Sequence, residues 1–343
     1  MRNNYNGDNR QELYNNQYRK KQRRKMRRRR VAFYTVTGLV FAVGLFFAGD
    51  YVMGILQKTD SPAKSVEVET PTEEVAADDL VKFVKGEGNV AIDFASTLPP
   101  KIDFNAIEPG KNHSIKASSY AYPLEEVKQW MKGEGSFEDK KIAFLTFDDG
   151  PVYNTTKVLD VLKEKNVPGT FFIPGNALAS YDDKTILNRY IEEGHGIAIH
   201  SYSHDYKYLY PNRTASPDRI VEEFFKTRDL MRETLGDTFD TKVFRFPGGA
   251  MSWKNIPAAQ EALKESGVMD VDWNSMSGDS EPQNRRPESV QAMGDFVFKT
   301  LDQNNHTNVA MVLMHDLKEA TPEYLGRVID GFIERGYSFG IIE

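Results

Sequence analysis

The sequence predicts an α/β domain built as a distorted, incomplete (β/α)7 barrel, preceded by a single N-terminal transmembrane helix and a stalk. From residue 141 onward, apolar runs of strand length alternate with amphipathic segments of helical length. Such alternation is typical of a parallel sheet covered by helices. Near the N-terminus, a charge-free segment at 31–49 directly follows a strongly basic one, which is typical of a membrane anchor.

Charge divides the chain into two parts. The 343 residues carry 44 Lys+Arg and 50 Asp+Glu, a net charge of −6. Residues 1–30 contain 12 Lys+Arg and two acids, a net charge of +10, so the remaining residues carry −16. The sequence has no cysteine, which excludes disulfides, Cys-ligated zinc, iron–sulfur clusters and thiol catalysis.

The first two segments are expected to be a cytoplasmic basic tail, 1–30, and a transmembrane anchor, 31–56. As a helix, the charge-free stretch spans about 28 Å, close to the thickness of a hydrocarbon core. A cleaved signal peptide is the alternative, but its apolar region is usually only about 7–15 residues long. The basic cluster on the amino side predicts a single-pass protein of the cell membrane with everything after the anchor outside. A basic cluster beside a membrane segment sets the orientation of that segment and is attracted to anionic lipids. These two effects explain the cluster, so no nucleic-acid partner is expected.

Two further segments separate the anchor from the main domain. Residues 57–79 contain two lysines, seven acids and two prolines, which predicts a disordered acidic stalk. Residues 80–135 are expected to form a small extracellular segment of unknown role, with two candidate strands and a helical pattern at 123–132. The main domain is expected at 136–343.

Seven apolar runs predict the strands of the main domain, at 142–147, 169–174, 196–201, 242–247, 268–273, 309–315 and 337–342. Six amphipathic segments predict its helices, at 155–166, 183–194, 216–235, 254–266, 287–304 and 322–335. Polar residues interrupt the apolar pattern at the carboxyl ends of several strands. In a barrel those ends meet at one mouth, where catalytic residues lie, whereas in an open sheet they would spread along an edge. A barrel-like closure is the simpler way to bring them together.

The first two polar clusters contain residue types that bind metal ions. Asp148 and Asp149 end the first strand and precede Gly-Pro, a pattern that is also common in ordinary turns. Because adjacent side chains on an extended backbone diverge, the two acids should have different partners. His200 and His204 lie at a strand-to-loop junction, where they could bind one metal ion with a carboxylate as third ligand, or could be structural.

Three further clusters lie at later strand ends. Arg245 ends a strand in the segment RFPGG, and it needs a partner there because an unpaired buried cation is costly. Asp279 closes the segment DWNSMSGD, and His315 ends an apolar strand and precedes another Asp. Outside the clusters, His113 and His306 are expected in solvent-exposed loops. His195 is expected to bond to local backbone.

Together, the five clusters resemble those of the NodB-homology polysaccharide deacetylases of carbohydrate esterase family 4. Their order matches motif by motif over 146–316, and TFDDGP and H-S-x-x-H are the most specific signatures. The resemblance covers about 141–343. It implies a distorted β/α barrel and the metal-dependent hydrolytic removal of acetyl groups from amino sugars. The overall organisation resembles that of membrane-anchored peptidoglycan N-acetylglucosamine deacetylases.

The resemblance implies a metal centre and a base beside it. Asp149, His200 and His204 would bind one divalent ion, zinc or a related transition metal. Asp148 would act as the general base, and Arg245 would pair with it and hold it in place.

The resemblance also implies the remaining roles. Asp279 would orient and charge His315, the general acid, while the backbone N–H near Gly248 would help to hold the oxyanion. Leu313 would line the pocket for the acetyl methyl group. The chain departs from the family pattern in two places, because many members have Arg-x-Pro-Tyr where this chain has RFPGG and Asp-Trp where it has Asp279-Ser280. These departures concern the subsites that surround the sugar, not the reaction.

The predicted function is therefore the deacetylation of N-acetylglucosamine in peptidoglycan, with release of acetate. Deacetylation of N-acetylmuramic acid or of a secreted exopolysaccharide is the nearest alternative. A catalytically silent glycan-binding module is an alternative of another class, although the proposed base, acid and both their partners are present. A zinc peptidase with a helical His-Glu-x-x-His is not indicated, because that motif is absent.

Overall fold

A computed structural model of the chain describes residues 102–134, 141–304 and 308–343. The predicted basic tail 1–30, anchor 31–56 and stalk 57–79 lie outside the described residues, as do residues 80–101 and His306. Within the described residues, no helix is both long and apolar enough to cross a membrane. The predicted anchor and its topology therefore stay predictions.

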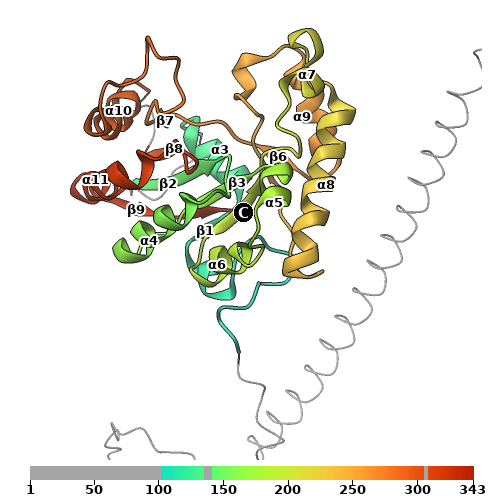
Figure 1. Cartoon of the computed structure of the whole chain (residues 1–343), viewed down its shortest axis with the longest axis horizontal. Helices are drawn as coiled ribbons and strands as arrows, with labels where there is room; N and C mark the ends of the chain where they lie inside the picture. The colour runs from blue at the N-terminus through green and yellow to red at the C-terminus, as the bar shows by residue number, and fades with distance from the viewer. Residues whose placement is uncertain (1–101, 135–140, 305–307) are drawn as a thin grey trace, which may run out of the picture. The chain divides into compact units, whose positions relative to one another are not determined.

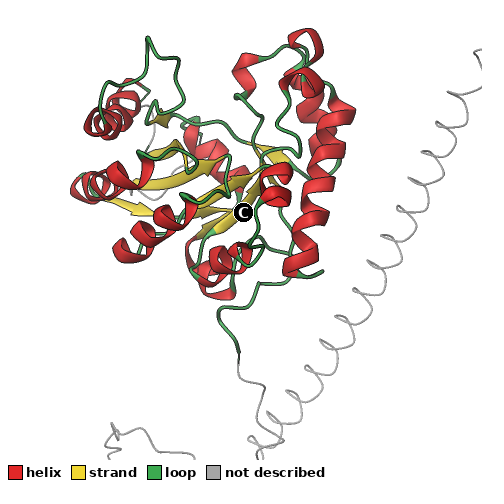
Figure 2. Ribbon diagram, viewed as in Figure 1, coloured by secondary structure: helices red, strands yellow, loops and turns green. Residues whose placement is uncertain are grey.

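A parallel sheet of eight strands forms the centre of the domain (Figures 1 and 2). Its strands follow the order β6-β5-β4-β3-β2-β8-β7, and β9 pairs with β2. The first and last strands of this order are not paired with each other, so the sheet curves as an incomplete barrel, as the sequence predicted. The strands are β2 (Lys141–Asp148), β3 (Thr170–Ile173), β4 (Gly196–Ile199), β5 (Val243–Phe244), β6 (Met269–Asp270), β7 (Ser275–Met276), β8 (Val309–His315) and β9 (Tyr337–Phe339).

Two of the predicted strands differ in the structure. The predicted strand 268–273 is shortened to β6, which pairs with β5. The chain then crosses the sheet to β7, a short strand that was not predicted, which pairs with β8 at the opposite edge. Asn274 stabilises the crossing, because its side chain donates to Val309 O at 2.8 Å and accepts from Met311 N at 2.8 Å. The predicted strand 337–342 becomes β9 and β10 (Ile341–Ile342), and β10 pairs with β1 (Ala121–Tyr122).

Helices pack around the sheet close to the predicted positions (Figure 2). The six expected helices are α4 (Thr155–Lys165), α6 (Ile186–Glu192), α8 (Pro217–Leu235), α9 (Ile256–Glu265), α10 (Val290–Gln303) and α11 (Thr321–Glu334). The predicted helix at 123–132 is α3 (Leu124–Met131). Two short helices that the pattern did not predict follow strand ends: α5 (Gly175–Ser180) and α7 (Tyr206–Leu209).

The alternation of side chains along β2 explains how the barrel presents its polar residues. Phe144 lies in the core inside the barrel, and Leu145 lies in the core between sheet and helices. Because successive side chains of a strand point to opposite faces, Thr146 and Asp148 continue the inner row beyond Phe144. Apolar side chains thus fill the lower barrel, and the last residue of the strand points into the mouth.

Residues 102–134 close the barrel at the amino ends of its strands. The segment bonds to this end through Asn112, whose side-chain amide donates to Ile197 O at 3.1 Å and Ile342 O at 3.0 Å. Leu124 and Val127 of α3 are buried in the inner core. The described part of this segment, to which sequence analysis assigned no role, thus forms the floor of the barrel.

Two histidines outside the polar clusters lie in buried positions. His113 was expected in an exposed loop, and this expectation is wrong, because its side chain is fully buried. Its Nδ1 lies 2.8 Å from Ser114 O and its Nε2 lies 2.9 Å from Glu343 Oε2. Its main partner is 230 residues away, so local sequence could not predict it. His195 accepts the backbone N–H of Gly169 at 3.1 Å. The partner is backbone, as expected, but it is 26 residues away in the sequence and not local.

Candidate active site

A cleft at the carboxyl ends of the strands brings the predicted site residues together. Its walls include eight of the nine predicted residues: Asp148, Asp149, His200, His204, Gly248, Asp279, Leu313 and His315. The ninth, Arg245, is fully buried and bonds to Asp148. Five polar clusters that are separated by up to 167 residues in sequence therefore meet at one mouth, as a barrel-like closure predicts.

The first group in the cleft has the geometry of a metal site. One ligand atom each from Asp149, His200 and His204 lies within 4.8 Å of the others. Asp149 Oδ1 is 3.6 Å from His200 Nε2 and 3.2 Å from His204 Nε2. This carboxylate oxygen is buried and has no hydrogen-bond partner among the described residues. A buried acceptor of this kind is costly unless a ligand or ion satisfies it, and the three residues fit a divalent metal with open positions for other ligands.

The surroundings of the two candidate metal-ligand histidines suit this role. His200 Nδ1 lies 2.9 Å from Arg245 O, which directs Nε2 towards Asp149. Burial lowers the pKa of His200 to about 3, so its ring is neutral and can donate a lone pair. The backbones of Asp149 and His204 have positive φ angles of 78° and 51°, an uncommon conformation for residues with a side chain. Such strain persists only where other contacts hold the backbone in place.

Side chains of α8 hold the loop that carries both histidines. The carboxylate of Glu223 accepts the N–H groups of Tyr202 at 3.1 Å and Ser203 at 3.0 Å. Thr227 donates its hydroxyl to Ser201 O at 2.8 Å. The sequence analysis missed these two residues. Their signal was the presence of polar side chains in the buried stripe of α8, which otherwise contains Ile220, Phe224 and Met231.

The predicted base lies beside the metal group and is paired with an arginine. Asp148 Oδ1 accepts from Arg245 Nη1 at 2.8 Å, and the same Nη1 donates to Thr146 Oγ1 at 2.8 Å. Arg245 Nε donates to Val271 O, and the guanidinium lies 3.9 Å from the centre of the Phe172 ring. Burial raises the pKa of Asp148, although the positive charge of Arg245 opposes this rise. The other carboxylate oxygen of Asp148 lies 3.7 Å from His200 Nε2, next to the metal group.

On the opposite wall, the predicted acid is paired with a second buried carboxylate. His315 Nδ1 lies 2.8 Å from Asp279 Oδ1, and the backbone N–H of His315 donates to Asp279 Oδ2 at 2.9 Å. The hydroxyl of Tyr324 also donates to this carboxylate, at 3.1 Å. Burial alone would lower the pKa of His315, but Asp279 outweighs it and raises this pKa to about 9. The imidazole is therefore protonated at neutral pH, with Nε2 on the side of Asp149, 4.0 Å from Oδ2.

The remaining predicted residues complete the cleft. The backbone N–H of Gly248 has no acceptor in the described part of the chain, and it is thus available to a ligand. Leu313 is nearly buried and lines the cleft together with Met276, forming an apolar patch. Ser280, which stands where many family members have Trp, places its hydroxyl 3.1 Å from His315 Nδ1.

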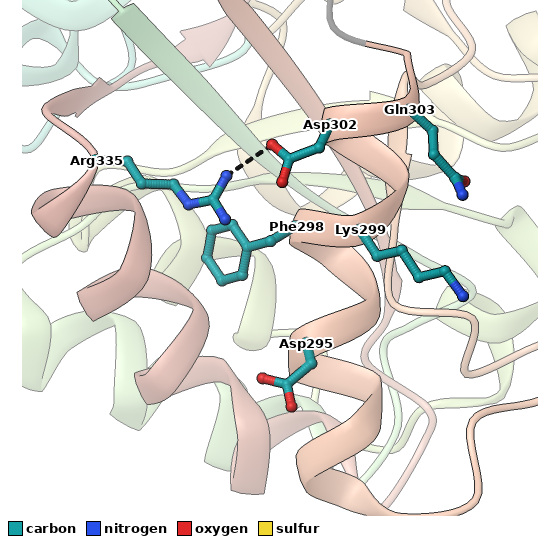
Figure 3. A pocket seen from close by; sticks show the side chains of 6 residues that line it. All are labelled: Asp295, Phe298, Lys299, Asp302, Gln303 and Arg335. Atoms are coloured by element: carbon teal, nitrogen blue, oxygen red, sulfur yellow. Dashed lines mark hydrogen bonds and ion pairs between the residues drawn. The ribbon is translucent and has the colours of Figure 1, made fainter.

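A second depression lies on the outer surface, between α10 and the end of α11 (Figure 3). Arg335 pairs with Asp302 at 2.8 Å and lies over the ring of Phe298. Two of its four charged side chains thus pair with each other, and Asp295 pairs with Arg327 beside it. Within the described ranges, the group of residues that could hold a metal ion lies in the other cleft, at Asp149, His200 and His204. We assign no chemistry to this depression.

Comparisons with known proteins identify similar sequences and structures. The sequence profile of the family described as "Polysaccharide deacetylase" matches residues 136–266. The chain is 32% identical over 207 residues to the putative polysaccharide deacetylase YheN of Bacillus subtilis, and this alignment covers 59% of this chain and 67% of YheN. It is 27% identical over 233 residues to a peptidoglycan-N-acetylglucosamine deacetylase of Bacillus cereus, and this alignment covers 67% of this chain and 79% of the B. cereus protein.

A solved structure gives the same result for the fold. The CE4 esterase of Streptococcus mutans is 40% identical, with a TM-score of 0.65, and the alignment covers 71% of this chain and 100% of that one. The profile match ends before Asp279 and His315, so the placement of this pair rests on the geometry described above.

Proposed function

This chain belongs to the polysaccharide deacetylase family, whose members are hydrolases that act on amide bonds, and we propose that it deacetylates N-acetylglucosamine in peptidoglycan. One observation carries this proposal above the others. A metal-binding group, an acid paired with arginine and a histidine paired with acid line the same cleft. Amide hydrolysis by water requires these three functions: activation of the carbonyl, a base for the water and an acid for the leaving amine.

Asp149, His200 and His204 would hold the metal ion of this reaction. Two imidazoles and one carboxylate suit zinc and related divalent transition metals. When bound, such an ion supplies Lewis-acid activation of the water and of the substrate carbonyl.

Asp148 would accept the proton of the attacking water. The paired Arg245 opposes the rise in the pKa of Asp148 that burial causes, and so favours the ionised carboxylate. A second bond from the same guanidinium to Thr146 fixes the orientation of the pair. Because Arg245 occupies Oδ1, Oδ2 remains for the proton. The water oxygen forms a bond to the acetyl carbon, and the backbone N–H of Gly248 can donate to the oxygen that gains negative charge.

His315 would complete the reaction at the opposite wall. Its imidazolium donates the Nε2 proton to the amide nitrogen as the C–N bond breaks, which yields acetate and a free amino sugar. Asp279 holds the other ring nitrogen, so the ring presents Nε2 to the cleft. Leu313 and Met276 offer an apolar surface that suits the acetyl methyl group.

Peptidoglycan is proposed as the polymer because several similar proteins carry names that state this substrate. They include the relative from B. cereus and a Listeria monocytogenes protein that is 30% identical over 207 residues. The test uses the full-length protein in detergent with added Zn²⁺, on reduced muropeptides and on poly-N-acetylglucosamine. Mass spectrometry should show acetyl loss from the N-acetylglucosamine residue of muropeptides.

The other results would each assign a different function. Acetyl loss from the N-acetylmuramic acid residue, or only from poly-N-acetylglucosamine, would overturn the proposed substrate and retain the deacetylase activity. Binding to muropeptides without acetate release would indicate a silent glycan-binding module. An inactive Asp148→Asn variant that retains the fold serves as the control for contaminating deacetylase activity.

We further propose that residues 31–56 anchor the enzyme in the cell membrane with the catalytic domain outside. The support is the sequence alone, namely the basic run at 19–30 followed by a charge-free stretch at 31–49. In fractionated cells, the protein should remain with membranes after a high-salt wash, and protease added to intact protoplasts should digest residues 102–343. Recovery in the soluble fraction would refute the anchor.

A further inference from the structure

The segment RFPGG ends in two glycines whose missing side chains make room for aromatic rings. Gly248 and Gly249 both have positive φ angles, 77° and 79°. A Cβ atom on Gly248 would lie 3.3 Å from the hydroxyl of Tyr206, and one on Gly249 would lie 2.8 Å from the ring of Trp273. Both rings also line the cleft. The double glycine is therefore the point where two aromatic walls approach the backbone of the cleft.

Tyr206 is fixed in this position by its neighbours. Its ring centre lies 5.1 Å from that of Trp253 and 5.3 Å from that of His204. Trp253 in turn stacks on Tyr210 with centres 4.1 Å apart, and its indole N–H donates to Pro247 O at 2.9 Å. The ring of Tyr206 is thus preorganised and does not have to be ordered when a ligand binds.

Tyr206 nevertheless keeps free groups for a ligand. Its side chain is 44% exposed although it packs against three rings. Its hydroxyl has no hydrogen-bond partner anywhere in residues 102–134, 141–304 and 308–343. A rigid aromatic face with a free hydroxyl at the rim of a polar cleft suits a ligand that has both apolar C–H faces and hydroxyl groups.

We propose that Tyr206 determines specificity for the sugar by packing its ring on the pyranose that carries the acetamide. This inference rests on the proposed function and adds the contact that selects a sugar over other acetylated molecules. It also explains the departure from Arg-x-Pro-Tyr. The aromatic side chain absent at Gly248 is replaced by Tyr206, which reaches the same place from α7, two residues after a metal-ligand histidine.

The test compares Tyr206→Ala and Tyr206→Phe with Tyr208→Ala. Tyr208 lies on the same helix and is half-exposed, but it does not line the cleft, so it is a matched control. Zn²⁺-loaded full-length proteins are assayed on N-acetylglucosamine oligosaccharides and on 4-nitrophenyl acetate, a small ester without a sugar ring. We expect Tyr206→Ala to raise KM for the oligosaccharide about tenfold, the loss typical of an aromatic contact. With the ester, the loss in kcat/KM should be much smaller than with the oligosaccharide, because the ester has no pyranose ring for Tyr206 to contact.

The phenylalanine variant separates the ring from the hydroxyl. Tyr206→Phe should raise KM only about two- to fivefold, since it keeps the ring and loses at most one neutral hydrogen bond. Equal losses on oligosaccharide and ester in Tyr206→Ala would mean that Tyr206 supports the metal site through His204, and would overturn the proposal. A KM equal to that of Tyr208→Ala would also overturn it, while the deacetylase function would stand.

Calorimetric binding of the same oligosaccharides distinguishes failure of this inference from failure of the proposed function. If the unmodified protein binds them without releasing acetate, the proposed function fails, and a tenfold weaker binding by Tyr206→Ala still supports the sugar contact. If the unmodified protein does not bind them at all, the sugar contact is overturned.

Discussion

Replacing Asp279 with Asn tests the role of the acid pair most directly. The substitution keeps the shape of the side chain and removes the charge that faces His315 Nδ1 at 2.8 Å. Burial lowers the pKa of His315, but Asp279, with smaller contributions from Asp149 and Asp148, outweighs this effect and raises the pKa from 6.5 to about 9. Without this charge, burial should return the pKa to 6.5 or below.

The consequence for catalysis has a definite sign. A general acid acts in its protonated form, so kcat/KM falls as the pH rises through its pKa. With a pKa of about 9, about 97% of His315 is protonated at pH 7.5, whereas with a pKa of 6.5 about 9% is protonated. Asp279→Asn should therefore lose about tenfold in kcat/KM at pH 7.5 through protonation alone, and lost orientation of the ring would add to this.

The assay is the dependence of kcat/KM on pH between about 5 and 10. The alkaline limb should move from near pH 9 in the unmodified enzyme to pH 6.5 or lower in Asp279→Asn, and NMR titration of the His315 C–H signals should move with it. Asp302→Asn, which removes an exposed carboxylate that pairs with Arg335, is the matched control. If the alkaline limb of Asp279→Asn stays near pH 9, the general-acid assignment of His315 is refuted.

Three further changes test other parts of the structure. Removal of metal by a chelator should abolish acetate release. In thermal unfolding, Zn²⁺ at about one hundred times its Kd should stabilise the unmodified enzyme by ~2.7 kcal/mol. The same Zn²⁺ concentration should not stabilise the His200→Ala variant. Glu223→Leu should weaken Zn²⁺ binding about 10- to 100-fold in a competition titration, because the histidine loop loses its acceptor; unchanged affinity would show that the loop holds itself. Contacts with His113 and Lys111 lower the pKa of Glu343 from 4.5 to about 2. The stabilisation of the fold by the ionised Glu343 is therefore present above pH 4.5 and is lost as the pH falls towards 2. Glu343→Gln should lower the free energy of unfolding at pH 7 by ~1 kcal/mol after allowance for partial exposure, with the difference from the unmodified protein vanishing near pH 2 in urea titrations; a difference that is independent of pH would exclude the ion pairs as its cause.

Local patterns in the sequence were enough to predict the long elements and the cluster at the mouth. β2 and β8 are buried on both faces, so their apolar runs were visible, and their polar last residues Asp148 and His315 marked the carboxyl ends. The convergence of these ends followed from the barrel topology, since parallel strands bring them to one side.

Features that depend on distant partners could not be predicted in the same way. The segment 268–273 reads as one strand, but only Met269–Asp270 forms β6 beside β5, and β7 follows at the opposite edge of the sheet beside β8. Nothing in the local pattern shows that the barrel opens between β6 and β7. His113 is buried because Glu343 lies beside it. Glu223 looked like one more polar residue of a helix, and only its position in the buried stripe distinguished it.

The floor formed by residues 102–134 is also the part of the domain at which the described chain enters it. In Figure 1 the described chain begins below the barrel, near α6 and far from α7, while the cleft lies at the opposite ends of the strands. If the proposed anchor exists, the chain that leads from it enters the domain on the side of the barrel opposite the cleft. The residues between the proposed anchor and the floor, 57–101, can reach at most about 150–160 Å when fully extended. The enzyme would then modify the layer of polymer within that radius, so the age of a glycan strand and its distance from the membrane would decide whether it is modified.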